Sequence, residues 1–313
     1  MAQLANPNLQ FPNLEYPNSC CKSALLIYFI ELLFMWFFRP TGLRQQELRT
    51  GSKLRSAIEE ARNLSLVRRS LDLQLLNSAP HYLNAVSPQA RIRWGAMVCE
   101  EFSTHFKLGP DQPEPDQRIF LVTLCDRRCC TSHQEKNIPI ARFIRILRRG
   151  LGGLSYIGMI EPAYYANVCE GARIYGKRLV SWHLHLLAWG ESRKKMQKRI
   201  DGLNKQKILL PIADGLAAAH QKCISKGKLA SKICYLLKSP RKAYRLSKWD
   251  TITPDGEIIP KFKQWKDDLR PGERLTLFRL LQDMYLDHLV LAGGEGAKIL
   301  RRVKRRVVRD LPN

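Results

Sequence analysis

The alternation of apolar and polar residues in Ser181–Leu187 (SWHLHLL) constrains the fold more than any other feature of the sequence. Side chains of a β-strand point alternately to opposite faces, so the apolar residues lie on one face and His183 and His185 on the other. A rise of about 3.3 Å per residue puts the two histidine Cα atoms about 6–7 Å apart. Both imidazoles can then reach one metal ion, for which imidazole is a common ligand. The alternative is a pair of structural histidines that hydrogen-bond within a packed sheet.

A second apolar segment precedes this strand and fits a hairpin with it. Leu154–Tyr164 and Lys177–Trp189 are expected to be two strands around a glycine-containing connection. If the hairpin turns about the Gly171-Ala172 dipeptide, opposed residue numbers add up to about 344, which puts Glu161 across from His183 and on the histidine face. A carboxylate and two imidazoles suit Mg²⁺ or Mn²⁺, so these three side chains are the candidate metal ligands. The alternative for Glu161 is an exposed carboxylate of the hairpin.

The remaining pattern mixes helices and strands and predicts an α+β fold. Helices are expected within residues 40–78 and at Ile92–Phe106, Asn137–Arg149 and Lys228–Ser239. Ile119–Cys125 (IFLVTLC) is short and apolar, which is typical of a buried strand. We therefore expect an antiparallel sheet that carries the histidine strand and is flanked by helices, with further helical regions at both ends of the chain.

Three prolines within the polar stretch Gly109–Asp116 mark the clearest boundary between domains. The length of 313 residues allows about two domains. We predict a mostly helical region over residues 1–117, a central domain over 118–249, and a helical, basic region over 250–313. The last region ends in the amphipathic basic segment Lys298–Arg309, which favours DNA over a membrane as the partner.

The helix expected at Lys228–Ser239 carries Tyr235 on its polar side. Its leucines and Ile233 form the buried stripe, and the tyrosine lies opposite, among lysines. A phenol among lysines is suited to approach a phosphate, because the lysines stabilise negative charge as it develops. The alternative is a surface tyrosine that packs on lysine side chains.

The chain has 52 Lys+Arg and 28 Asp+Glu, a formal net charge of +24, which indicates a polyanionic partner such as DNA, RNA or an acidic membrane surface. Basic residues form a stripe on the helix expected at Asn137–Arg149 and also surround the tyrosine. The candidate DNA-binding residues are Arg142, Arg145, Arg148, Arg149, Lys228, Lys232, Arg241 and Lys242. A solvated charged face is the alternative interpretation.

Ala24–Phe38 is apolar except for Glu31, but it is shorter than the about 20 residues that a membrane-spanning helix needs. No secretory cleavage pattern follows it, so a buried or peripheral helix is expected; a membrane contact and an upstream extension that the working protein lacks are the alternatives. Nine scattered cysteines favour a reducing compartment, and we expect a cytoplasmic protein. Free thiols are expected rather than a zinc site at Cys125, Cys129, Cys130 and His133, because their spacing is not standard for zinc.

Three segments resemble, in order, the motifs of the HUH endonucleases: Phe120–Cys125 (FLVTLC), His183-Leu184-His185 and Tyr235-Leu236-Leu237-Lys238. The resemblance covers about residues 118–249. Within this superfamily, the chain resembles the single-tyrosine rolling-circle replication initiators of plasmids and small phages. Its tyrosine follows the histidines, and no second tyrosine lies within one helical turn of it. The sequence departs from that pattern in the polar run Asp126–Arg128 and in the long connection of the hairpin.

The resemblance implies a ferredoxin-like palm fold and a nicking and joining reaction on single-stranded or origin DNA. The hydroxyl group of Tyr235 would attack a phosphodiester, leaving a 5′-phosphotyrosyl enzyme and a free 3′-OH that primes replication. Mg²⁺ or Mn²⁺ at the three candidate ligands would polarise the phosphate, and Lys238 would orient or neutralise it.

No GxxxxGK[ST] phosphate loop is present in the sequence, so NTP binding is not expected and a host helicase would unwind the DNA. A single-tyrosine transposase or a mobilisation relaxase is the alternative with the same chemistry. A non-catalytic nucleic-acid-binding protein is the alternative from a different class.

Overall fold

The computed structural model describes residues 41–62, 71, 73–76, 83–108, 118–132, 135, 137–166, 178–213 and 215–309. The apolar segment 24–38, the proline-rich stretch around residues 109–117 and the connection at residues 167–177 lie outside these ranges, so the expectations that fall on them stay predictions. Within the described ranges, no helix is both long enough and apolar enough to cross a membrane.

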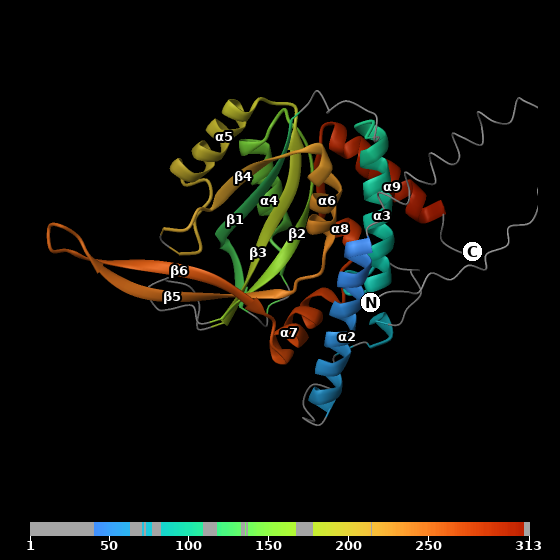
Figure 1. The fold of residues 1–313 in the computed structure, drawn as a ribbon, viewed down its shortest axis with the longest axis horizontal. Helices are drawn as coiled ribbons and strands as arrows, with labels where there is room; N and C mark the ends of the chain where they lie inside the picture. Colours follow the sequence, from blue (N-terminus) through green and yellow to red (C-terminus); the bar gives the residue numbers. More distant parts are fainter. Residues whose placement is uncertain are drawn as a thin grey trace, which may run out of the picture. The chain divides into compact units, whose positions relative to one another are not determined.

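A curled, mostly antiparallel sheet forms the centre of the fold (Figure 1). Its strands follow the order β4-β1-β3-β2-β5-β6, and β7 pairs with β2 outside this path. The strands are β1 Ile119–Ser132, β2 Ser155–Ala166, β3 Arg178–Trp189, β4 Ala219–Ile224, β5 Lys242–Ile252, β6 Ile258–Asp268 and β7 Val290–Gly293. The pairing of β5 with β2 is parallel, and the other pairings are antiparallel.

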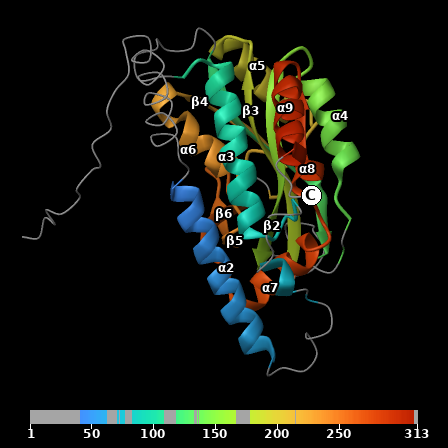
Figure 2. The same cartoon turned by 90° about the vertical axis from the view of Figure 1, so that its right-hand side faces the viewer.

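Helices lie on both sides of this sheet. They are α2 Thr41–Arg62, α3 Pro88–His105, α4 Ile140–Gly150, α5 Arg193–Lys205, α6 Leu229–Leu237, α7 Pro271–Leu281, α8 Leu286–Leu289 and α9 Glu295–Arg309, with the 3-10 turns η2 Leu73–Leu76 and η4 Lys226–Lys228. In Figure 2, α3 and α6 lie on one side of the sheet and α4 lies on the other. The predicted α+β class with helices around a sheet is therefore confirmed.

The hairpin of β2 and β3 has the register that the sequence predicts. Glu161 pairs with His183, and the same register holds along the full length of the hairpin. The apolar side chains on the opposite face of β3 are fully buried, and each large one contributes about 1.5–3 kcal/mol when it leaves water. Gly158 permits the close approach of the strands, because a Cβ atom there would lie 2.3 Å from the Cβ of Leu186.

β1 is longer than the predicted strand Ile119–Cys125, because a bulge keeps the chain in the sheet. Cys125 pairs with His183 and Cys130 pairs with Ser181, so β1 has extra residues between these two pairs. The polar run that departs from the endonuclease motif therefore occupies the bulge and does not end the strand.

Several boundaries differ from the sequence prediction. α2 ends at Arg62, inside the range 40–78, and α4 begins at Ile140 after Pro139 rather than at Asn137. The boundary expected between residues 249 and 250 falls within β5, and β7 pairs with β2. Residues of the C-terminal region thus complete the central sheet. The sequence patterns above do not predict α5, β4 or β5, and β6 and β7 lie in the region 250–313 that the sequence predicts to be helical.

Candidate active site

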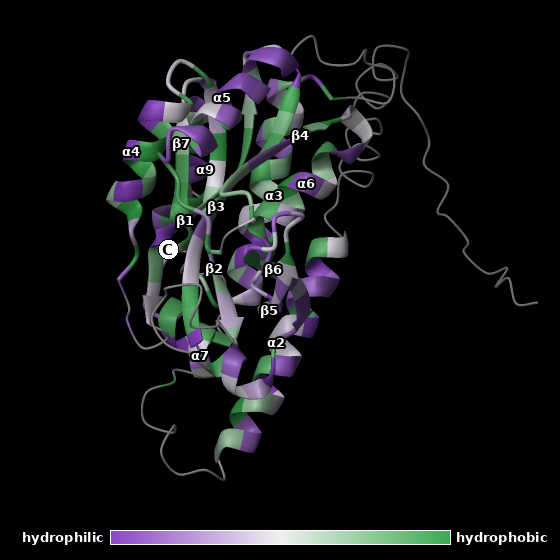
Figure 3. Cartoon of the chain, turned by 90° about the vertical axis from the view of Figure 1, so that its left-hand side faces the viewer, coloured by the Kyte–Doolittle hydropathy of each residue, from purple (hydrophilic) through white to green (hydrophobic). Residues whose placement is uncertain are grey.

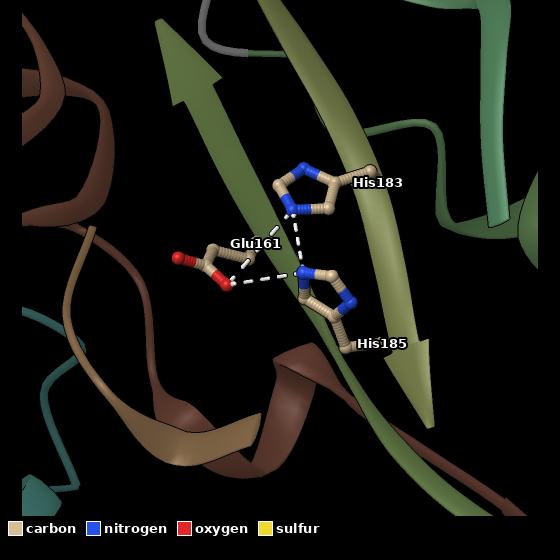
Figure 4. Close-up of side chains that lie close together, drawn as sticks. All are labelled: Glu161, His183 and His185. Carbon is tan, nitrogen blue, oxygen red and sulfur yellow. Dashed lines mark hydrogen bonds and ion pairs between the residues drawn. The ribbon is translucent and has the colours of Figure 1, made fainter. Parts of the chain in front are cut away.

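Glu161, His183 and His185 form a buried cluster on one face of the sheet (Figure 4). The Nε2 atoms of the two histidines lie 3.0 Å apart. Oε2 of Glu161 lies 3.9 Å from Nε2 of His183 and 3.8 Å from Nε2 of His185. The register of β2 and β3 brings the carboxylate opposite the first histidine, and strand alternation keeps the second on the same face. The cluster could hold a metal ion.

Hydrogen bonds determine which imidazole nitrogen faces the cluster. Nδ1 of His183 lies 3.4 Å from the carbonyl oxygen of Ser181, which only accepts, so Nδ1 carries the proton and Nε2 offers a lone pair. Nδ1 of His185 lies 2.8 Å from Oγ1 of Thr123, a hydroxyl that fixes the plane of the ring.

Burial also keeps both imidazoles uncharged. Desolvation lowers the pKa of His183, and it lowers the pKa of His185 well below its ordinary value, with the neighbouring His183 as the next cause. Both rings are therefore neutral at pH 7, which is the form that binds metal ions.

This donor set fits a divalent cation. Two imidazole nitrogens and a carboxylate oxygen converge within 4.8 Å of one another, and all three are atoms that can bind a divalent cation. Three protein ligands leave coordination positions open for a substrate oxygen. In the part of the chain that the structure describes, no other group of three or more His, Cys, Asp or Glu side chains could hold an ion.

The cysteines of β1 do not add to this metal site. Burial raises the pKa of Cys125 and of Cys129 to about 12 and that of Cys130 to about 11. All three are free thiols, and none belongs to the group of described side chains that could hold a metal ion. His133 lies outside the described residues.

Tyr235 points from α6 to the histidine cluster. Its hydroxyl oxygen lies 3.4 Å from Nε2 of His185, and the centroids of the two rings are 5.0 Å apart. α6 buries its apolar stripe on the other side, as the helical periodicity predicts. Burial raises the pKa of Tyr235, with the positive charge of Lys238 as an opposing influence, so the phenol is protonated at neutral pH.

Lys238 joins the tyrosine helix to the metal-ligand cluster. Its Nζ atom donates hydrogen bonds of 2.9 Å and 3.2 Å to the two carboxylate oxygens of Glu161, and it lies 4.5 Å from the ring centroid of Tyr235. Nζ of Lys232 lies 5.7 Å from the same ring. The predicted contact of Lys238 with phosphate stays a prediction, since its partner in the structure is a carboxylate.

Two buried charged residues of the N-terminal helices hold the end of α6. The guanidinium group of Arg91 in α3 donates hydrogen bonds to the carbonyl oxygens of Leu237 and Lys238, at 2.9 Å and 3.1 Å. The carboxylate of Glu47 in α2 accepts hydrogen bonds from the backbone N–H and the hydroxyl group of Ser239. These contacts satisfy backbone groups that a helix end leaves unpaired. They position the segment that carries Tyr235 and Lys238.

The predicted basic stripe of α4 lies on the side of the sheet away from α6 (Figure 2). In Figure 3, α4 has alternating hydrophobic and hydrophilic bands. Arg145, Arg148 and Arg149 are exposed, whereas Arg142 is half-buried. The guanidinium group of Arg142 lies 2.6 Å from the fully buried carboxylate of Asp126 in the β1 bulge. Arg142 thus has a structural partner, which its place in the stripe does not predict.

The other candidate phosphate-binding residues surround α6. Lys228 is exposed at its N-terminal end, and Arg241 is half-buried three residues beyond Lys238. Lys242 forms a salt bridge of 2.6 Å with Asp268. The three side chains therefore lie on the segments adjoining the tyrosine helix, and the structure does not test whether they bind DNA.

Three residues near the cluster are absent from the sequence prediction. Thr123 contacts His185, as described above. Alternation along β1 puts its side chain on the histidine face, which could have indicated this contact. The ring of Tyr244 in β5 stacks on Tyr165 in β2 with a centroid distance of 4.9 Å, and Nζ of Lys266 lies 5.0 Å from the ring of Tyr244. Local sequence gives no signal for the last two, because the pairing of β5 with β2 and β6 brings them to the site.

Comparisons with protein-family models, with curated proteins and with solved structures find no match for this chain. The class of the protein is therefore defined by its own features: an α+β fold with a curled sheet and a buried His-His-Glu cluster.

Proposed function

We propose that this protein is a metal-dependent DNA nicking and joining enzyme of the HUH type, and more narrowly a single-tyrosine initiator of rolling-circle replication. The observation that carries the proposal is the distance of 3.4 Å between the hydroxyl oxygen of Tyr235 and Nε2 of His185, because a phenol lies beside a buried group of candidate metal ligands. The order of the three motifs and the net charge of +24 support the same function.

In the proposed reaction, the Tyr235 hydroxyl oxygen attacks the phosphorus of a single-stranded DNA phosphodiester. An O–P bond to the tyrosine forms while the bond from phosphorus to O3′ breaks, and the proton of the phenol reaches the leaving oxygen through solvent. The products are a 5′-phosphotyrosyl enzyme and a free 3′-OH. Attack of a 3′-OH on the phosphotyrosine reverses these steps and joins two ends.

The side chains around Tyr235 would bind and orient the phosphate. Lys232 and Lys238 bring positive charge to the ring of the nucleophile, where phosphate oxygens would collect negative charge. Thr123 and Ser181 hold the two imidazoles in fixed orientations. A Mg²⁺ or Mn²⁺ ion bound by Glu161 and the two histidines would polarise the scissile phosphate as a Lewis acid.

A replication initiator would also need partners. It would bind the DNA of an origin, and a host helicase would unwind the duplex. A transposase or a mobilisation relaxase would use the same nucleophile, so these alternatives differ in the DNA substrate and not in the chemistry of the site.

The test is a covalent adduct between the full chain and DNA. The protein is incubated with a pool of 3′-labelled single-stranded DNA of random sequence and with supercoiled plasmid, in Mg²⁺, in Mn²⁺ and in EDTA. We expect an SDS-stable labelled band that needs the metal, with the DNA attached to the peptide that contains Tyr235. A protein that binds both substrates but forms no adduct with either metal would instead be a non-catalytic nucleic-acid-binding protein.

A further inference from the structure

β5 and β6 form a two-stranded ribbon that extends away from the central sheet (Figure 1). The two strands pair from Lys242 and Asp268 as far as Ile252 and Ile258. β5 pairs with β2 only through Ala243–Arg245, so the outer part of the ribbon has no third strand among the described residues. Isolated two-stranded hairpins are marginally stable in water, and packing against another element stabilises them.

One face of this ribbon combines tryptophan and lysine. Opposed pairs along it are Arg245 with Trp265, Ser247 with Lys263, and Trp249 with Lys261. Opposed residues and residues two apart share a face, so these six positions belong to the same face. We call this surface the tryptophan face.

Three side chains of the tryptophan face are exposed, whereas Arg245 is buried and forms ion pairs with Asp267 and Glu273. Trp249 is 44% exposed and Trp265 is 39% exposed, which is unusual for the largest apolar side chain. Lys263 is also exposed, at the pair of residues between the two tryptophans. The strand positions on this face contain no Asp or Glu between Arg245 and Thr251 or between Ile259 and Trp265.

We propose that the tryptophan face binds single-stranded DNA, with bases stacked on Trp249 and Trp265 and phosphates near Lys263. Aromatic rings that alternate with basic groups suit this ligand, because every base has a flat surface for stacking and every nucleotide carries a negative charge. A second copy of the chain or an acidic protein would not need two separated indole rings with lysine between them.

One end of the ribbon adjoins the strand that carries Glu161, because β5 pairs with β2 there. Near this end, Tyr244 pairs with Lys266, and Tyr244 stacks on Tyr165 of the strand that carries Glu161. The tryptophans lie on the other face of β5 and β6, so a bound strand would pass over the edge of the ribbon. This inference rests on the proposed function because it takes single-stranded DNA as the ligand.

Binding of fluorescein-labelled oligo(dT) to the full chain in EDTA tests the proposal without any cleavage. Trp249→Ala and Trp265→Ala should each raise the Kd by between about 5-fold and about 150-fold. Trp249→Phe should retain part of the affinity, because a phenyl ring still stacks. Lys263→Ala should reduce the slope of log Kd against log salt by about 1. Quenching of tryptophan fluorescence by oligo(dT) should decrease in the double alanine variant.

Ile252→Ala is the matched control. It removes an apolar side chain that is 72% exposed on the same strand, but alternation puts it on the opposite face from Trp249, so the Kd should not change. Tryptophan variants with the wild-type Kd would overturn the proposal. Variants that keep the Kd but lose concentration-dependent self-association would overturn it in favour of contact with a second copy.

The failure of this proposal is distinct from the failure of the proposed function. If the wild-type protein forms the phosphotyrosyl adduct and the tryptophan variants bind oligo(dT) normally, the ribbon proposal fails and the nuclease proposal stands. If the wild-type protein forms no adduct but the variants bind oligo(dT) weakly, the ribbon proposal stands and the nuclease proposal fails.

Discussion

The ammonium group of Lys238 lies 2.9 Å from one carboxylate oxygen of Glu161 and 3.2 Å from the other. Glu161 belongs to β2 and Lys238 follows α6, so this contact links a candidate metal ligand to the segment that carries the candidate nucleophile. A bound cation and the ammonium group would share the same carboxylate. The lysine thus affects the site in two opposite ways, by competing for the carboxylate and by supplying charge beside Tyr235.

Replacing Lys238 with methionine should separate these two effects. Loss of the ammonium group removes a positive charge next to the ion, so Mn²⁺ should bind about fivefold more tightly, a change of about 1 kcal/mol. The rate of adduct formation should fall, since the variant lacks a cation near the phosphate. Calorimetric Mn²⁺ titration and single-turnover cleavage measure the two quantities. Lys232→Met, on the adjoining helix α6, is the control. Unchanged or weaker Mn²⁺ binding in Lys238→Met would contradict the competition.

Replacing either histidine of the cluster with alanine should abolish detectable Mn²⁺ binding, because each removes one of three protein ligands. Thr123→Val should weaken binding about tenfold, since it leaves the ligands in place but frees the ring of His185 to rotate. His220→Ala is the matched control, as His220 pairs with Thr123 across the sheet but lies outside the cluster. Electron paramagnetic resonance of Mn²⁺ reports the bound fraction directly. Equal loss in the His220 and His185 variants would show that the cluster is not the metal site.

Tyr235→Phe should eliminate the covalent adduct and leave DNA affinity within about twofold, because it removes one hydroxyl group that donates no other hydrogen bond in the described structure. Tyr244→Phe should retain the adduct. Tyr244 is the informative comparison, because it lies near the same cluster and burial raises its pKa beyond that of an ordinary tyrosine. Denaturing gels of the wild-type protein and the two variants with labelled DNA identify the nucleophile. An adduct that persists in Tyr235→Phe and disappears in Tyr244→Phe would show that Tyr244 is the nucleophile.

Arginines of the α4 stripe should have different roles. Arg142→Ala should lower the free energy of unfolding by about 2 kcal/mol, since the buried carboxylate of Asp126 loses one of its two guanidinium partners. Joint replacement of the exposed residues Arg145, Arg148 and Arg149 by alanine should leave stability within about 0.5 kcal/mol for each substitution. If this surface contacts phosphates, the triple variant should also reduce the salt dependence of DNA binding. Urea unfolding and salt titrations of the Kd test the two parts separately.

The candidate site residues could be predicted from the sequence where strand or helix periodicity determines which way a side chain points. Alternation in β3 puts His183 and His185 on one face, and the symmetry of a hairpin then selects Glu161. Helical periodicity likewise puts Tyr235 opposite the buried stripe of α6. These inferences need only local geometry and one turn.

The contacts that depend on long-range pairing could not be predicted. Lys266 reaches the neighbourhood of the cluster because β5 adds to the edge of β2 in parallel, and no local pattern specifies that edge. The ion pair of Arg142 with Asp126 could not be predicted either, because the bulge that buries Asp126 looks in the sequence like a polar run at the end of a strand.

The hydrogen bonds of Arg91 and Glu47 at the end of α6 determine which fragments of the chain would keep the site intact. A fragment limited to residues 118–249 would contain all three resembling motifs, but it would lack both charged side chains that bind Leu237, Lys238 and Ser239. Such a fragment would also end in the middle of β5. A fragment that keeps these contacts and all of β5 and β6 begins ahead of Glu47 and extends to Asp268. The motifs and the residues that hold them in place therefore do not occupy the same stretch of sequence.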